Sequence, residues 1–199
     1  MRDHGPAQRR GRWLLGSAAG AMIIFLAAAS SGSAQQRGGA GGAGTPVERG
    51  KYLVSITGCH DCHSPKVKGG MTPDPERPLS GRPSTTPIPS KMDGEIHTAL
   101  DLTAWTGPWG QSVASNLTPD KATGLLSKGY TEATFLQTMR SGKKPNGTQM
   151  QPPMPVDVYQ NLTDDDLKAI WAYLQTLKPI RNAVLAGTAP APAPAPAKK

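Results

Sequence analysis

The sequence predicts an all-α domain, and three observations support this prediction. Three segments combine a capping residue with apolar residues at helical spacing. Strand signals are weak, and residues 94–107 favour only a short hairpin or a helical turn. About 70 residues rich in Pro, Gly, Ser and Thr separate the first helix from the second, which is unusual in a compact domain. With only 5% aromatic residues, we expect these loops to wrap a large rigid object.

The first predicted helix begins after Thr45. This residue is a natural N-cap, Pro46 suits the first helical position, and Glu48 completes a capping box. The helix should lead directly to Cys59. Its expected apolar face consists of Val47, Leu53, Val54 and Ile56.

The second predicted helix lies within residues 130–142. Thr131 is its cap, Phe135 and Met139 fall four residues apart on one face, and Gly142 is its stop signal.

The third predicted helix has the clearest pattern. Thr163 is its cap, the three aspartates that follow favour a helix start, and Lys178 precedes the terminating Pro179. Its apolar stripe consists of Leu167, Ile170, Trp171, Leu174 and Leu177.

The first 34 residues are typical of an export signal. Four arginines lie within residues 1–12, an uncharged apolar run covers residues 13–29, and small residues lead to a predicted cleavage site after Ala34. The apolar run has 17 residues, so an uncut N-terminal membrane anchor is the alternative.

The remaining chain divides by composition. Residues 35–44 read as a Gly-rich linker, residues 45–186 as the folded domain, and residues 187–199 as an Ala/Pro-rich disordered tail. Without the four arginines and one aspartate of the leader, 18 basic and 13 acidic side chains remain, a formal +5. The basic residues are scattered, so we expect no nucleic-acid binding.

The motif CHDCH at residues 59–63 contains the only two cysteines of the chain. A structural zinc site needs about four ligands, and beyond the motif and the leader only His97 could add an imidazole. A redox dithiol is expected beside a βαβ pattern, and a disulfide across so short a loop stabilises little. Covalent heme fits best: Cys59 and Cys62 would form thioethers to the two vinyl groups, and His63 would ligate the iron.

We expect His63 to donate its other ring N–H to a backbone carbonyl, that of Pro65 or of another proline in the following loop. His60 is expected to be a surface residue. The candidates for a second axial ligand are His97, Met71, Met92, Met139, Met150 and Met154.

Among these candidates Met154 has the stiffest surroundings, because prolines flank it on both sides. Met139 reads as a core residue, and Met71 and Met92 lie in Pro/Gly loops close to the motif. From the residues alone, Met154 as a ligand and Met154 as a core residue remain open, with Met150 as the main competitor.

Residues 47–182 resemble the single-heme class I cytochromes c, in particular a bacterial periplasmic branch similar to the cytochrome subunits of membrane-associated dehydrogenases. The resemblance is carried by RGKYLVSITGCHDCH, GPWGQSVASNLTPDKATGL, FLQTMRSGK and PPMPVDVYQNLTDDDLKAIWAYLQTLKPIRN. It implies a class I cytochrome c fold around one covalent heme. The family's MPW appears here as MPV, so an aromatic role at position 156 is lost.

The resemblance also implies roles for particular residues. Met154 would be the distal ligand, and Gly50 would lie where the first helix crosses Trp171 or Tyr173 of the last. The segments GPWG and SNLTPD would line the heme edge, with Trp109 or Asn116 near it.

The function that follows is periplasmic electron transfer rather than enzyme catalysis. One His/Met-ligated heme c would pass electrons from a dehydrogenase donor to an oxidase or another cytochrome, and residues 13–29 would provide any membrane anchoring. The alternative is a heme-based gas sensor or peroxidase-like enzyme with a displaceable distal ligand, although no distal acid/base group is recognisable in the sequence.

Overall fold

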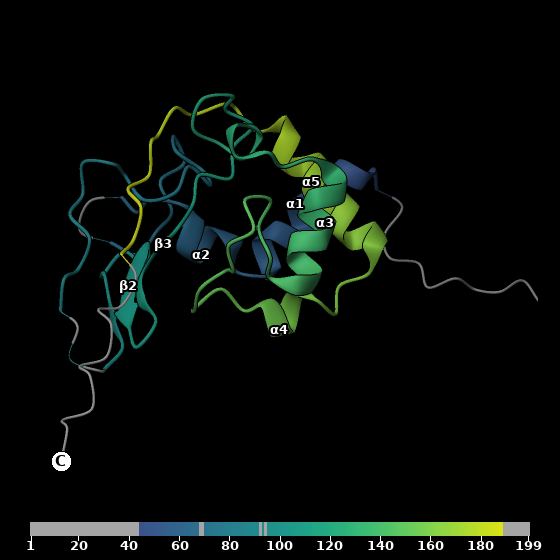
Figure 1. Ribbon diagram of the computed structural model, residues 1–199. Helices are drawn as coiled ribbons and strands as arrows, with labels where there is room; N and C mark the ends of the chain where they lie inside the picture. The colour runs from purple at the N-terminus through teal and green to yellow at the C-terminus, as the bar shows by residue number, and fades with distance from the viewer. Residues whose placement is uncertain (1–43, 68–69, 92, 94, 189–199) are drawn as a thin grey trace, which may run out of the picture. The chain divides into compact units, whose positions relative to one another are not determined.

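The computed structural model describes residues 44–67, 70–91, 93 and 95–188 (Figure 1). Its elements, in chain order, are α1 (Pro46–Ile56), α2 (Cys59–His63), β1 (His97–Thr98), β2 (Ala104–Gly107), β3 (Gly110–Val113), the 3-10 helix η1 (Leu126–Lys128), α3 (Glu132–Ser141), α4 (Val156–Tyr159) and α5 (Asp164–Thr176). The predicted export signal, nearly all of the predicted linker and tail, and Met92 lie outside the described residues.

The three strands correct the all-α prediction. They form one antiparallel sheet in the order β1-β2-β3, with Trp105 paired to Ser112 and Ala104 to Val113. A short hairpin was one of the two expectations for residues 94–107, and β1 and β2 form it, so the backbone groups of these strands find their partners across the pair. The fold therefore combines five described helices with a small sheet.

The three predicted helices are confirmed as α1, α3 and α5, together with their caps. Thr45 accepts the Glu48 amide, and the Glu48 carboxylate accepts the Thr45 amide at 2.7 Å, which completes the capping box. The hydroxyls of Thr131 and Thr163 likewise accept a backbone amide from the first turn of α3 and α5, respectively. Gly142 ends α3 in the left-handed conformation.

Helices α1 and α5 cross in close contact at Gly50. A Cβ at this position would lie 1.9 Å from the carbonyl oxygen of Ala169 and 2.8 Å from the Cβ of Tyr173. The predicted crossing is therefore confirmed, with Tyr173 rather than Trp171 against the glycine. Trp171 packs instead on Phe135 of α3, with ring centroids 5.5 Å apart.

The end of α1 differs from the prediction. The helix stops at Ile56, and Thr57 and Gly58 turn the chain into the separate short helix α2. This turn leaves Ile56 58% exposed, so it is not part of the core face.

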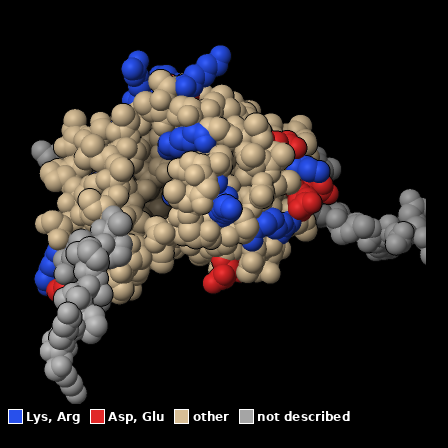
Figure 2. Space-filling view, in the orientation of Figure 1, with Lys and Arg blue, Asp and Glu red and all other residues tan. Residues whose placement is uncertain are grey.

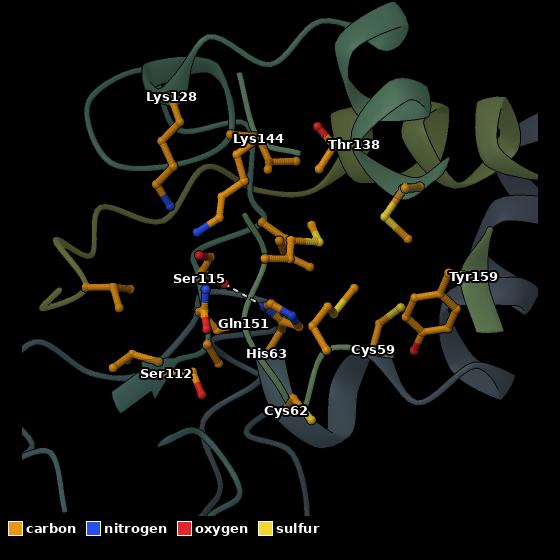
Figure 3. Close-up of a pocket in the computed structure, with 18 of the residues that line it drawn as sticks. Cys59, Cys62, His63, Ser112, Ser115, Lys128, Thr138, Lys144, Gln151 and Tyr159 are labelled. Carbon is orange, nitrogen blue, oxygen red and sulfur yellow. Dashed lines mark hydrogen bonds between the residues drawn. The ribbon is translucent and has the colours of Figure 1, made fainter. Parts of the chain in front are cut away.

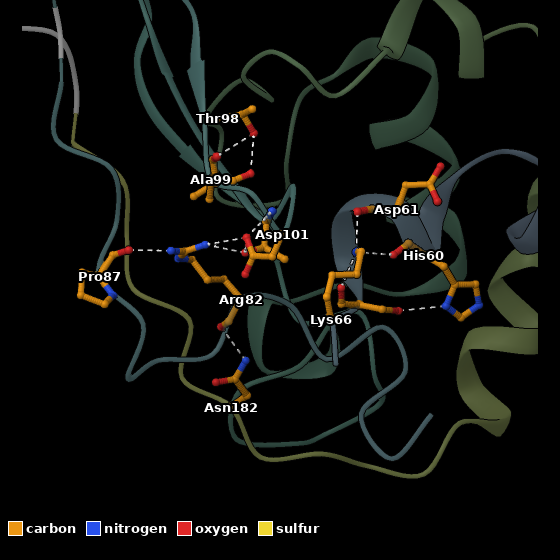
Figure 4. Close-up of polar contacts among 12 residues, drawn as sticks. His60, Asp61, Lys66, Arg82, Pro87, Thr98, Ala99, Asp101 and Asn182 are labelled. Atoms are coloured by element: carbon orange, nitrogen blue, oxygen red, sulfur yellow. Dashed lines mark hydrogen bonds and ion pairs between the residues drawn. The ribbon is translucent and has the colours of Figure 1, made fainter. Parts of the chain in front are cut away.

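The long loop region from residue 64 to 125 is held by buried polar groups (Figure 4). The Arg82 guanidinium, 4% exposed, donates to Asp101 at 3.1 Å and to Thr103 at 2.5 Å. The Asn182 amide donates to the carbonyls of Ser80 and Arg82 at 2.7 and 2.8 Å. These bonds fix the loops beside α2, although few apolar side chains are buried there.

Within the described ranges, no helix is both long and apolar enough to cross a membrane.

Candidate heme site

A cavity of about 670 Å³ lies between the helices, the sheet and the loops (Figure 3). Its walls come from the end of α1, from α2, from residues 111–115, from α3 and α5, from the loop that contains Met150 and Met154, and from residues 184–187. The volume falls in the range of sites that bury a small-molecule ligand or cofactor. Most of the lining is apolar, and the residues of the CHDCH motif that line it are Cys59, Cys62 and His63.

Helix α2 places the two thiols and the imidazole on the cavity wall. Burial raises the pKa of both the Cys59 and Cys62 thiols, so they are protonated at neutral pH. They are not joined by a disulfide. The Lys66 ammonium donates to the carbonyls of His60, Asp61 and Ser64, the last two at 2.7 and 2.8 Å, and thereby stabilises the C-terminal end of this short helix.

One nitrogen of the His63 ring forms a hydrogen bond, and the other is available to bind a metal. Its Nδ1 lies 2.8 Å from the carbonyl oxygen of Ser115, and because a carbonyl can only accept, the proton is on Nδ1. Burial, the largest cause, lowers the pKa of His63 to about 4, so the ring is neutral at pH 7. The Nε2 atom therefore carries a lone pair, which is the form of histidine that ligates a metal.

The partner carbonyl belongs to Ser115, not to Pro65 or a nearby proline. Gly81 makes this approach possible, because its amide donates to the carbonyl of His63 at 2.7 Å while its α-carbon lies against residues 114–116. A Cβ on Gly81 would lie 2.6 Å from the Asn116 amide nitrogen, and its φ of +76° also favours glycine. Sequence reasoning missed Ser115, which is 52 residues from His63.

The structure reduces the candidates for the second axial ligand. Met139, Met150 and Met154 all line the cavity, whereas Met71 is 54% exposed outside it. His97 does not line it either, and its Nε2 lies 2.7 Å from an Asp93 carboxylate oxygen. As expected from its helix face, Met139 belongs to the buried core, and Met150 and Met154 pack against that core from the loop.

The loop that carries Met154 is attached at its start and at its middle, and it is closed by a local bond. The Met150 amide donates to the carbonyl of Gly142 at 2.7 Å, and within the loop the Val156 amide donates to the carbonyl of Met154 at 2.9 Å. Between them, the Ser112 hydroxyl on β3 donates to the carbonyl of Pro152. The small sheet thus positions the methionine loop, a role that the sequence did not indicate.

Three aromatic residues of the wall were not singled out from the sequence, namely Trp105, Tyr130 and Tyr159. Trp105 lines the cavity, whereas Trp109 and Asn116, expected near its edge, do not. Trp109 donates instead to the Ser112 hydroxyl at 3.1 Å. The Tyr159 hydroxyl donates to the carbonyl of Thr57 at 2.5 Å, and burial, the largest cause, raises its pKa to about 12.

Residues 47–178 match the family described as cytochrome c. The chain belongs to the cytochrome c family. Membership implies a c-type heme and a role in electron transfer, and it supports a class I cytochrome c fold in which the sheet is an addition to the helices.

This cytochrome is similar to subunits of several dehydrogenases. It is 30% identical over 135 residues to the fructose dehydrogenase cytochrome subunit of Gluconobacter japonicus. This aligned region covers 67% of this chain and 22% of the relative. It is 32% identical over 139 residues to the gluconate 2-dehydrogenase cytochrome c subunit of Pantoea cypripedii (69% and 24%), and 25% identical over 135 residues to the alcohol dehydrogenase (quinone) cytochrome c subunit of Gluconobacter oxydans (67% and 22%). The chain thus spans less than a quarter of the length of these relatives.

The cavity fits a covalently attached heme in size and in chemistry. Both thiols and a neutral imidazole with its Nε2 lone pair free line the same largely apolar space, and methionine sulfurs also line it. A largely apolar wall favours a porphyrin, whereas the thiols and the imidazole would supply its covalent and metal attachments.

Proposed function

We propose that this cytochrome carries one electron on a single heme c, attached through Cys59 and Cys62 and ligated by His63 and Met154. The observation that carries the proposal is that both thiols, the Nε2-bearing imidazole and the Met154 thioether line one cavity. The chain holds one CHDCH motif, which supports one heme. The iron of a heme supplies a reversible one-electron couple, and methionine ligation raises its potential.

The chain's own residues would keep electron transfer fast by fixing the orientation of the two axial ligands. Ser115 fixes the orientation of the His63 ring, and Ser112 fixes the loop of Met154. Fixed ligands need little rearrangement when the charge on the iron changes. Met154 is favoured over Met150 because prolines precede and follow it, which restricts its backbone.

The partners follow from the relatives. Their names as cytochrome subunits of dehydrogenases support a dehydrogenase as the electron donor. An oxidase or another cytochrome would then be the acceptor. Export through residues 1–34 would place the protein in the periplasm, soluble or anchored by residues 13–29. Cell fractionation of full-length protein and of a variant lacking residues 1–34 tests this placement, and equal cytoplasmic recovery of both would contradict it.

Optical spectroscopy of the purified protein tests the ligands. We expect a low-spin spectrum with the methionine-to-ferric-iron charge-transfer band, which Met154→Ala abolishes while heme stays covalently bound. The matched controls are Met150→Ala and Met139→Leu, which change the other two methionines of the cavity and should keep the band.

Two results would contradict the proposal. If Met150→Ala removes the band and Met154→Ala does not, the ligand assignment is wrong. A high-spin spectrum, or ready binding of carbon monoxide by the reduced protein, would instead support the gas-sensor or peroxidase-like alternative.

A further inference from the structure

Two lysines give the cavity a charge that the proposed ligands do not use. Among the described residues that line it, Lys128 and Lys144 are the basic side chains besides the proposed ligand His63, and no Asp or Glu contributes. In the view of Figure 2, blue side chains border the hollow and the red ones lie away from its rim. The cavity is therefore cationic.

The two ammonium groups point to the same part of the cavity. Figure 3 shows both side chains extending toward Ser115 and His63. Burial lowers the pKa of Lys128 and of Lys144, and the charge of Lys144 lowers that of Lys128 further. The two charges thus converge at one place near His63.

The backbone holds both lysines in position. Lys128 ends η1, where its amide donates to the carbonyl of Leu125 at 3.0 Å. Lys144 lies in a turn closed by bonds to Thr148 and Gly147, both 2.9 Å. Neither ammonium forms an ion pair with a residue in the described ranges.

Such an arrangement favours an anion. Lys144 is half-buried and Lys128 is exposed at the cavity, and Figure 3 shows the two like charges extending toward one place on its wall. An anion at this place would remove the repulsion and gain charge-assisted hydrogen bonds. The site calls for a ligand with two negative charges.

We propose that Lys128 and Lys144 bind the two propionate carboxylates of the heme, an inference that rests on the proposed heme function. A heme carries two carboxylates, which match the two ammonium groups in number and sign. Its carboxylates and its two vinyl groups are attached at different parts of the ring. In Figure 3 the lysines likewise lie on a different side of His63 from Cys59 and Cys62.

The test is the midpoint potential of the heme-bearing protein as a function of pH, measured for Lys128→Gln, Lys144→Gln and the double variant. A deprotonated propionate stabilises ferric iron, so the potential falls as pH rises through the propionate pKa. Loss of a neighbouring cation should raise that pKa. The pH range in which the midpoint potential falls should then shift upward by about one pH unit or more. The double variant should show the largest shift.

The controls separate charge from other effects. Lys51→Gln removes an exposed lysine on α1 that does not line the cavity, and should leave the pH profile unchanged. Lys128→Arg and Lys144→Arg keep the charge and should retain most of the wild-type profile.

Three results would overturn the inference in distinguishable ways. A heme-bearing double variant with the wild-type pH profile shows that the lysines do not bind the propionates. An unchanged profile with an altered salt dependence of electron transfer assigns them to docking an acidic partner instead. Wild-type protein without covalent heme refutes the proposed function itself, and the inference with it.

Discussion

The helical region and the long loop region are stabilised by different kinds of buried residue. Leu53, Val54, Leu167, Ile170 and Leu174 form an apolar core between α1, α3 and α5. The loop region instead buries polar side chains, namely Ser64, Ser80, Arg82, Thr103, Thr106, Asn116 and Thr118. One region is thus held by non-directional apolar contact and the other by directional hydrogen bonds, and the cavity lies where both contribute.

The largest effect is expected from Gly50→Ala in the helical region. The new Cβ would overlap the Ala169 carbonyl, so α1 and α5 would have to separate. We expect a loss of about 3 kcal/mol or more in the free energy of unfolding, beyond the small helix-propensity gain of alanine. Guanidinium denaturation measures it, with Ser55→Ala on the exposed face of α1 as control. Equal stabilities of the two variants would show that the helices do not meet at Gly50.

Gly81→Ala makes the corresponding change in the loop region. It combines a φ of +76° with a contact at 2.6 Å to the Asn116 amide nitrogen, and we expect a loss of about 2 to 3 kcal/mol. Gly147→Ala is the matched control, because Gly147 has a φ of +82° but nothing within 4 Å of its added Cβ. Denaturation midpoints of both variants separate the contact from the backbone conformation. If the two losses are equal, the loop is not tightly packed against residues 114–116.

Asn182→Ala tests the polar contacts of the loop region directly. The buried amide donates to two carbonyls and accepts from the Ser84 amide at 3.1 Å. Unsatisfied partners should reduce the free energy of unfolding by about 2 kcal/mol. Urea denaturation measures the loss against Asn161→Ala, an exposed asparagine for which we expect a change within about 0.5 kcal/mol. A loss no greater than that of the control would mean that hydrogen bonds do not hold this region.

The smallest effect belongs to the exposed ion pair between Arg140 and Asp164, 2.6 Å apart. A hydrogen bond from the Arg140 side chain lowers the pKa of Asp164 below its ordinary value. When folding lowers the pKa of a carboxyl, the charged form stabilises the fold at pH values above the pKa of the unfolded chain. This contribution is lost as the pH falls through the lowered pKa of the folded protein. In Arg140→Gln, the pH midpoint of the Asp164 titration, followed by NMR, should move upward. An unmoved titration would show that the pair does not persist in solution.

The same contrast explains what could be predicted from the sequence. Helix caps and apolar stripes are local patterns, so Thr45, Thr131 and Thr163 were found with the helices that they begin. The CHDCH motif is also local, and the structure places both its thiols and His63 on one cavity. The small crossing residue Gly50 was indicated by family resemblance rather than by any local pattern.

What was missed depends on contacts between distant residues. The Ser115 carbonyl is one backbone group among many, and its choice depends on how Gly81 packs beside it. A short hairpin was one of two expectations for residues 94–107, where β1 and β2 pair, but β3 was not predicted because its short strand carries little β-branched alternation and is held by pairing. The sequence identified Met139 as a core residue but could not separate Met154 from Met150 by local pattern, since a thioether that packs in a core and one that ligates iron look the same in the chain.

The segment after α5 has a consequence for the timing of folding. Residues 184–187 complete the cavity wall, and the Gln111 amide bonds to the carbonyl of Thr188, a partner 77 residues away. Contacts between residues so far apart in the sequence form late in folding, because closing the long loop between them costs entropy before the contact can stabilise the chain. The motif is synthesised well before this last part of the wall. We therefore expect an interval in which a newly made chain presents its thiols in an open, accessible state, suited to attachment of the cofactor before the wall closes over it.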